Sequence, residues 1–190
     1  YLLYPSHVRI AQGADDVRQA MIDASRWGSH LTFRGGGTSL NGQASTDGIL
    51  VDVRRNFQGY RVEEGGAKIR VEPGLTVRMA NAVLRRHGFK IGPDPASEIA
   101  ATIGGVLANN ASGMSCGVKH NTYHLLDSLT FLTARGTLID TAEEGADQRF
   151  ASAEPELYAA LEEARDLVRA NPDLVTELRR QFAMKNTMGY

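Results

Sequence analysis

The sequence has little cysteine and no excess of either charge. Its 190 residues include one cysteine, Cys116, and the formal net charge at pH 7 is −1. A single cysteine excludes an intrachain disulfide and indicates a reducing compartment. A net charge near zero provides no basic field that would attract nucleic acid. We therefore expect no nucleic-acid partner, and any anion site has to be local.

Long apolar runs are also absent. No stretch approaches the roughly 18 apolar residues of a membrane-spanning helix, and no signal peptide is recognisable at the start. We expect a cytoplasmic protein, and attachment at the inner face of the membrane stays open for a full-length protein. Hydrophobic residues at 42% and charged residues at 23% are typical of a globular chain with a buried core.

Glycine is what the sequence has in quantity, and one run of it follows a short apolar stretch. Residues 34–43 read Arg-Gly-Gly-Gly-Thr-Ser-Leu-Asn-Gly-Gln. Three consecutive glycines allow positive φ values and let a ligand approach the backbone N–H groups, which can converge on an anion. Arg34 adds a fixed positive charge, and Thr38 and Ser39 add hydroxyl donors. The run predicts a diphosphate site, although alone it also fits a ligand-free surface turn.

Two common phosphate-binding loops do not fit this run. A Walker-type loop needs a lysine after its last glycine, and no lysine occurs between Arg34 and Lys68. The Rossmann pattern, started at Gly35, places its third glycine at Leu40. The predicted diphosphate site is therefore of another kind.

The pattern of expected elements divides the chain into two lobes, an α+β arrangement. Residues 1–56 predict strand, helix, strand, loop, strand, which is typical of a small parallel sheet with a crossover helix. Residues 57–190 predict antiparallel hairpins and helices. The expected strands are 7–10, 31–33, 49–52, 60–63, 68–71, 129–133 and 137–140, and helices are expected after Gly13, Thr76, Thr102, Glu154 and Asn171. Glu143, Glu144 and Asp147 are expected in a solvated loop.

A second segment, between residues 92 and 113, is rich in small residues. It contains Gly92-Pro-Asp-Pro-Ala-Ser97, then Thr102-Ile-Gly-Gly, then Asn109-Asn-Ala-Ser-Gly113. Such a segment buries too little apolar area to form a core element, and Asn109, Asn110 and Ser112 can donate hydrogen bonds. Two such segments on two lobes predict one extended ligand between them, while a packed loop crossing without ligand is the alternative.

These motifs carry a family resemblance. In order and spacing, Arg34-Gly-Gly-Gly-Thr-Ser-Leu, Pro93-Asp-Pro-Ala-Ser, Thr102-Ile-Gly-Gly and Asn110-Ala-Ser-Gly113 resemble the PCMH-type FAD-binding domain of the FAD-linked oxidases, the group of vanillyl-alcohol oxidase. Within that group the chain is most similar to cytochrome-linked and iron–sulfur-fused D-lactate and D-2-hydroxyacid dehydrogenases. The resemblance implies FAD between two α+β lobes. It assigns to the cofactor Arg34, Gly35, Gly36, Gly37, Thr38, Ser39, Gly42, Pro93, Ser97, Thr102, Gly104, Gly105, Asn110 and Gly113.

The resemblance also implies a function. The chain would be the FAD-binding portion of an oxidoreductase that oxidises a D-2-hydroxy acid such as D-lactate by hydride transfer to the flavin. Electrons would pass to a quinone, a cytochrome or an iron–sulfur module. The alternatives are an FAD-dependent sugar-nucleotide reductase of the same fold and a non-catalytic nucleotide-binding module.

Departures from the family pattern limit what can be assigned. No histidine lies between Arg34 and Gln43, so we expect FAD to be bound without a covalent link. Lys119-His120 stands where many relatives have Tyr-Gly. Relatives continue into further strands and a substrate domain, so we expect the second lobe to be truncated, the catalytic residues to lie beyond Tyr190, and the fragment to be inactive alone. We expect no metal site, because Cys116, His120 and His124 lack a fourth ligand.

Overall fold

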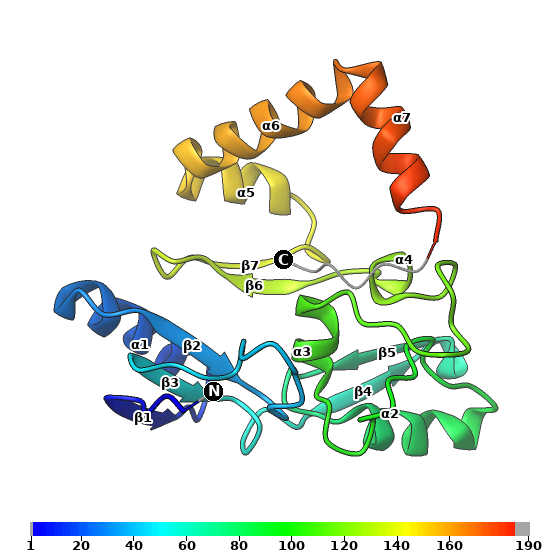
Figure 1. The fold of residues 1–190 in the computed structure, drawn as a ribbon, viewed down its shortest axis with the longest axis horizontal. Helices are drawn as coiled ribbons and strands as arrows, with labels where there is room; N and C mark the ends of the chain where they lie inside the picture. The colour runs from blue at the N-terminus through cyan, green and yellow to red at the C-terminus, as the bar shows by residue number, and fades with distance from the viewer. Residues whose placement is uncertain (1, 185–190) are drawn as a thin grey trace. The chain divides into compact units, whose positions relative to one another are not determined.

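The computed structural model describes residues 2–184, and these form two compact units (Figure 1). Residues 2–125 belong to the first unit and residues 126–184 to the second. The predicted boundary between lobes at residue 56 falls inside the first unit, at the change from a parallel to an antiparallel sheet. The division into lobes stays a prediction. Within the described range, no helix combines the length and apolar character needed to cross a membrane.

The first part of unit 1 is a three-stranded parallel sheet with one crossover helix. Its elements are β1 (His7–Ile10), α1 (Ala14–Trp27), β2 (Leu31–Arg34) and β3 (Ile49–Asp52), and the strand order is β1-β3-β2. Ile49 and Val51 of β3 are almost fully buried and pack with Ala20 and Ala24 of α1. A central strand of a parallel sheet is covered on both faces, which explains its continuous apolar run. This arrangement places the carboxyl end of β2 at the edge of the sheet.

The rest of unit 1 begins with the antiparallel pair β4 (Tyr60–Glu63) and β5 (Lys68–Val71). Helix α2 (Val77–Leu84) begins after Thr76, whose hydroxyl accepts a hydrogen bond from Met79 N at 3.2 Å, as expected of an N-cap. A short 3₁₀ turn (Arg85–His87) and the left-handed Gly88 end this helix. Helices α3 (Ile103–Ala108) and α4 (Thr122–Leu125) complete the unit.

Unit 2 contains the hairpin of β6 (Thr130–Leu132) and β7 (Leu138–Asp140), followed by α5 (Ala146–Ala153), α6 (Pro155–Arg169) and α7 (Pro172–Gln181). Helix α5 was not predicted, and the placement of Asp147 in a loop was wrong, because it lies in the first turn of this helix. Glu143, in the preceding turn, pairs with Arg149 of α5. The helix has the sequence Ala-Asp-Gln-Arg-Phe-Ala-Ser-Ala, with only one large apolar residue to reveal a helical period.

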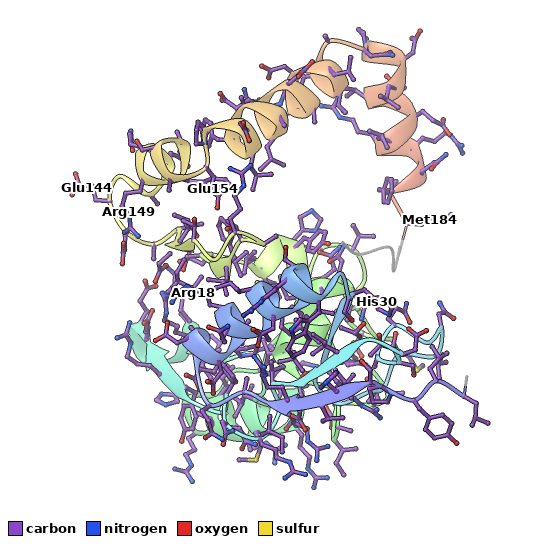
Figure 2. The ribbon with its side chains drawn as sticks, turned by 90° about the vertical axis from the view of Figure 1, so that its left-hand side faces the viewer. Arg18, His30, Glu144, Arg149, Glu154 and Met184 are labelled. Carbon is purple, nitrogen blue, oxygen red and sulfur yellow. The ribbon has the colours of Figure 1, made fainter. Side chains whose placement is uncertain are left out.

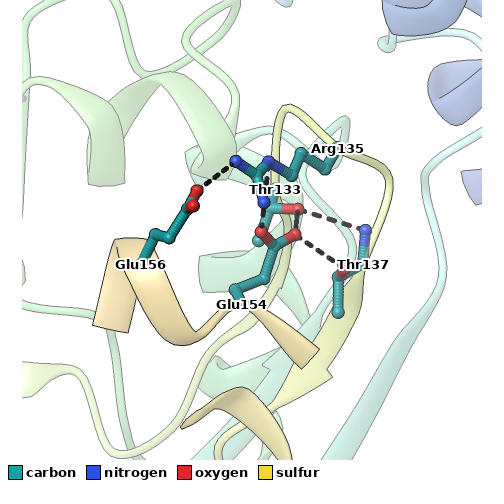
Figure 3. A network of polar contacts seen from close by, with 5 residues as sticks. All are labelled: Thr133, Arg135, Thr137, Glu154 and Glu156. Atoms are coloured by element: carbon teal, nitrogen blue, oxygen red, sulfur yellow. Dashed lines mark hydrogen bonds and ion pairs between the residues drawn. The ribbon is translucent and has the colours of Figure 1, made fainter. Parts of the chain in front are cut away.

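A buried carboxylate joins the hairpin of unit 2 to its helices. Glu154, at the start of α6, has 1% of its surface exposed and points toward the β6–β7 turn (Figures 2 and 3). Its Oε1 accepts hydrogen bonds from the hydroxyls of Thr133 and Thr137 at 2.6 and 2.7 Å. These bonds outweigh the effect of burial and lower the pKa of Glu154 below its usual value. The Glu154 carboxylate therefore links the β6–β7 turn to the start of α6.

Candidate functional site

The first glycine-rich run forms a loop at the carboxyl end of β2. The carbonyl of Arg34 still accepts a ladder hydrogen bond from Val53 N at 3.1 Å, and the loop begins directly afterwards. Gly37 and Gly42 have φ values of 64° and 82°, which favour glycine. A methyl group added at Gly37 would lie 3.0 Å from Nε and Nη2 of Arg34. The guanidinium is thus folded back over the loop that follows it.

The backbone donors of this loop are free. Within the part of the chain that the structure describes, no acceptor takes a hydrogen bond from the N–H groups of residues 35–39. The hydroxyl of Ser39, in contrast, is bonded to Oε1 of Gln43 at 2.5 Å. Five consecutive unused N–H groups beside a guanidinium can meet the oxygens of a diphosphate. The donors expected from the sequence are therefore present, and they come mainly from the backbone.

The loop lies directly against the second glycine-rich segment. A methyl group at Gly35 would overlap Oγ1 of Thr102, and a methyl group at Gly36 would overlap the carbonyl oxygen of Ala100. Thr102 itself is 2% exposed. A residue with a side chain would collide with the Thr102 side chain at position 35 and with the Ala100 backbone at position 36, so both positions require glycine. The two segments predicted to share one ligand are therefore in contact.

The second segment is fixed to the strand-to-helix connection before α2. Ile103 N donates to Leu75 O at 2.8 Å, and Gly104 N donates to Pro73 O at 2.9 Å. A methyl group at Gly104 would lie 2.6 Å from Pro73 Cβ, so this glycine is needed for packing. Gly105 is different, because a methyl group there would meet only Thr102 Oγ1, at an ordinary 3.7 Å. Gly105 is exposed, and its surface is open to a ligand.

Asp94, near the start of the second segment, contacts Gly113 at its end and Ser115 just after it. A methyl group at Gly113 would overlap Oδ1 and the carbonyl of Asp94, and Oδ2 of Asp94 accepts a hydrogen bond from Ser115 N at 3.1 Å. Burial raises the pKa of Asp94, but the hydrogen bonds from Ser115 and the backbone of Cys116 outweigh it, and the net shift is downward. Gly113 therefore serves the contact between the start and the end of this segment.

The remaining predicted residues differ in how far their polar groups are already used. Asn110 has a φ of 43°, and its Oδ1 accepts a hydrogen bond from Tyr123 N at 3.1 Å, so this oxygen stabilises the turn into α4. Pro93 is buried, and Ser97 is half-buried with its carbonyl bonded to the N–H groups of Ala100 and Ala101. Thr38 lies within the loop with the free N–H groups.

One buried hydroxyl has no partner. Ser112 is 6% exposed, and among the residues described its Oγ is the one buried side-chain polar atom without a hydrogen bond. An unpaired buried hydroxyl costs free energy unless a ligand satisfies it. Its residue type and its place in the second segment suggested a hydrogen-bonding role, but burial without a partner could not be read from the sequence. The unused groups and the close approach of the two segments fit a diphosphate-bearing cofactor.

The residues considered as metal ligands are engaged in local structure. Cys116 is buried, with its Sγ 3.4 Å from Gly117 O, and His120 N donates to Cys116 O. The ring Nδ1 of His124 lies 2.8 Å from Val118 O. Across residues 2–184 no three histidine, cysteine or acidic side chains gather in a way that could hold a metal ion.

Comparison with known sequences shows which proteins this chain is similar to. The family model described as FAD binding domain matches residues 5–142. D-2-hydroxyglutarate dehydrogenase of Pseudomonas putida is 41% identical over 101 residues, which are 51% of this chain and 10% of that protein. Its counterpart in Pantoea ananatis is 33% identical over 74% of this chain and 14% of that protein. The glycolate oxidase subunit GlcD of Escherichia coli is 31% identical over 77% of this chain and 30% of its own length.

Solved structures show the same fold. The 6-hydroxy-D-nicotine oxidase of Arthrobacter nicotinovorans matches 80% of this chain with a TM-score of 0.63 at 22% identity, and the match covers 33% of that chain. An alkyldihydroxyacetonephosphate synthase matches 73% of this chain with a TM-score of 0.59 at 18% identity, over 28% of its own length. These matches confirm the predicted α+β PCMH-type fold.

Proposed function

Because the chain belongs to the family of FAD binding domains of FAD-linked oxidases, we propose that it is the cofactor-binding portion of a flavoenzyme that oxidises a D-2-hydroxy acid. The observation that carries the proposal is the row of free N–H groups at residues 35–39, in a loop whose Gly35 and Gly36 lie against Thr102 and Ala100. Bound FAD supplies a hydride acceptor, which is the chemistry that oxidation of an alcohol carbon requires. The part of this chain is to bind and orient that cofactor.

We assign the diphosphate to the loop at the end of β2. The N–H groups of residues 35–39 would donate to its oxygens, and the Arg34 guanidinium would balance its charge. Thr38 belongs to the same cradle, and Gly42 shapes its far end through a positive φ. The Ser39 hydroxyl, which is bonded to Gln43, contributes mainly through its backbone.

We assign the rest of the cofactor to the second segment. Gly105 offers open backbone, Ser97 has a free hydroxyl, and the buried Ser112 hydroxyl lacks a partner that a bound cofactor would supply. Pro93, Thr102, Gly104, Asn110 and Gly113 hold these groups in position through packing and backbone hydrogen bonds. Since no histidine lies between residues 34 and 43, the proposed attachment is non-covalent.

The substrate class is proposed from the named relatives. Proteins named D-2-hydroxyglutarate dehydrogenase and glycolate oxidase align over half to three quarters of this chain, and both names denote 2-hydroxy acids. D-lactate belongs to the same class and is our first specific candidate. The chain spans about 10% to 30% of the curated relatives' lengths. The substrate-binding and proton-accepting groups are therefore proposed to lie outside residues 1–190, as is the contact with a quinone, cytochrome or iron–sulfur acceptor.

Cofactor binding and substrate choice can be tested separately. The purified chain should take up FAD and show flavin absorption bands, and acid precipitation should release all of the flavin into the supernatant. Flavin that stays with the precipitate would contradict non-covalent attachment. We propose a cytoplasmic location or one at the inner face of the membrane, which cell fractionation would distinguish.

For the substrate, the complete reading frame containing this chain should be loaded with FAD and mixed anaerobically with D-lactate, D-2-hydroxyglutarate or glycolate. Bleaching of the flavin by a D-acid but not by its L-enantiomer is the expected result. Bleaching by NADPH, followed by reoxidation with a sugar nucleotide, would instead support the sugar-nucleotide reductase. Failure to take up FAD would contradict both enzymes and leave the non-catalytic module.

A further inference from the structure

A separate groove lies in unit 1 between α2 and residues 88–98. Its cavity has a volume of about 720 Å³ and is lined by Arg78, Asn81, Arg85, Gly88, Phe89, Lys90, Asp94 and Glu98. Pockets that bind small ligands commonly measure roughly 300–1,000 Å³. None of these lining residues was assigned to the cofactor, so the groove is available for another ligand.

Two hydrogen bonds join the two walls of the groove. Oδ1 of Asn81 accepts from Ile91 N at 2.9 Å, and the carbonyl of Glu98 accepts from Arg78 N at 3.1 Å. Positions 78, 81 and 85 share one face of a helix, because residues three, four and seven apart lie above one another. The loop of residues 88–98 is therefore tied to the helix face that carries two of its cations.

The charged side chains that line the groove carry a net charge of +1, and its two arginines are unpaired within the described part of the chain. The side chains of Arg78 and Arg85 have neither an ion pair nor a hydrogen bond to any described residue. Lys90 acts electrostatically on Asp94, whose carboxylate is already occupied by the Ser115 N–H. Three cations face two carboxylates, of which only Glu98 is unengaged. The net positive charge and the two unpaired guanidinium groups favour an anionic ligand.

The two arginines are close enough to act on one ligand. Arg85, the first residue of the 3₁₀ turn, comes seven residues after Arg78 of α2, which corresponds to about 10 Å along a helix axis. Arginine side chains are long and bind phosphate oxygens in a bidentate manner, so the two guanidinium groups can converge on one diphosphate. Phe89, which is 50% exposed, adds an apolar wall for an organic part. We propose that the groove between α2 and residues 88–98 binds a small organic diphosphate, at a site distinct from the flavin loop.

The test uses the FAD-loaded protein, so that the loop at residues 35–39 is occupied. Calorimetric titration with inorganic pyrophosphate should give one site, with a Kd at least about tenfold lower than that for orthophosphate. Arg78→Gln and Arg85→Gln should each raise the pyrophosphate Kd by about tenfold or more. Arg86→Gln is the matched control, because Arg86 adjoins Arg85 but does not line the cavity. Its Kd should match that of the wild type.

Three results would overturn the proposal: no pyrophosphate binding at millimolar concentration, equal losses in Arg78→Gln and Arg86→Gln, or release of one FAD for each pyrophosphate bound. Circular dichroism and FAD content check that each variant is folded. If either arginine variant misfolds, Lys90→Gln replaces it, since Lys90 lies in the loop rather than in the helix. An unchanged Kd in that variant would also contradict the assignment.

Discussion

The two glycine-rich segments of unit 1 use their glycines in different ways. In the first, the backbone N–H groups of residues 35–39 are free, and glycines 35 and 36 allow close contact with Thr102 and Ala100. In the second, residues 101–104 are hydrogen-bonded to residues 73–77, and glycines 104 and 113 lie too close to Pro73 and Asp94 to carry a side chain. Only Gly105 has room beside it.

This difference shows that a glycine in such a motif can serve the protein or the ligand. Substitution of a glycine that packs against the protein should lower the free energy of unfolding, with or without cofactor. Substitution of a glycine that faces the ligand should weaken cofactor binding alone. Substitutions by alanine can separate these roles, because each adds one methyl group at a position whose surroundings are known.

The largest effect is expected for Gly36→Ala. The new methyl group would overlap the carbonyl oxygen of Ala100, which is backbone and can move only if the second segment shifts. Overpacking of this kind costs about 2 kcal/mol, and the loop should no longer retain FAD. Urea unfolding and FAD titration measure both effects. Gly13→Ala is the control, since nothing lies within 4 Å of its added methyl group, and normal FAD binding by Gly36→Ala would contradict the assigned role.

Gly35→Ala should destabilise the fold, and a second substitution at Thr102 should restore part of the lost stability. Its methyl group would overlap a side-chain atom, Oγ1 of Thr102, so removing that atom makes room. The double variant Gly35→Ala/Thr102→Ala should regain about 1 kcal/mol of stability relative to the sum of the single variants. The same Thr102→Ala change should not rescue Gly36→Ala. Additive losses in the first pair would mean that the two segments are not in contact as described.

Gly105→Ala should separate stability from binding. The methyl group has space in the protein, and alanine is favoured over glycine within a helix by up to about 1 kcal/mol. The free protein should therefore be as stable as the wild type or more so, while the FAD Kd rises by about tenfold. Thermal melting without FAD and fluorescence titration with FAD give the two values. An unchanged Kd would remove Gly105 from the cofactor site.

A smaller effect, dependent on pH, is expected at Asp94. Because its pKa in the folded protein is lowered, the ionised carboxylate stabilises the fold above the usual pKa of aspartate. That contribution is lost as the pH falls through the lower pKa of the folded state. Asp94→Asn should lower the melting temperature at pH 7 and flatten its decline below pH 5. A variant with the acid dependence of the wild type would show that other carboxylates control it.

The regular elements could be predicted from local sequence. The apolar run of β3, the cap at Thr76 and the stop at Gly88 depend on nearby residues, and each lies where it was predicted. Helices α4 and α5 were not predicted, because α4 has only four residues and the apolar pattern of α5 is too sparse to show a period. The site was predicted as two segments with a shared ligand.

Which glycine contacts which partner could not be predicted. The neighbours of Gly36 and Gly113 are distant in sequence, and no local pattern records them. The same holds for Ser112, whose unpaired hydroxyl depends on what surrounds it in three dimensions. The accessible N–H groups of residues 35–37 could be predicted from the glycine run, since no side chain shields the backbone there.

The contact of Gly36 with Ala100 also bears on the order of events during synthesis. These residues are far apart in the sequence, so the contact closes a long loop and forms late compared with local hairpins and helices. A nascent chain that has exposed only the first sheet would carry the phosphate loop without its other wall. Capture of FAD is therefore expected only after residues 100–102 have left the ribosome and packed against the loop.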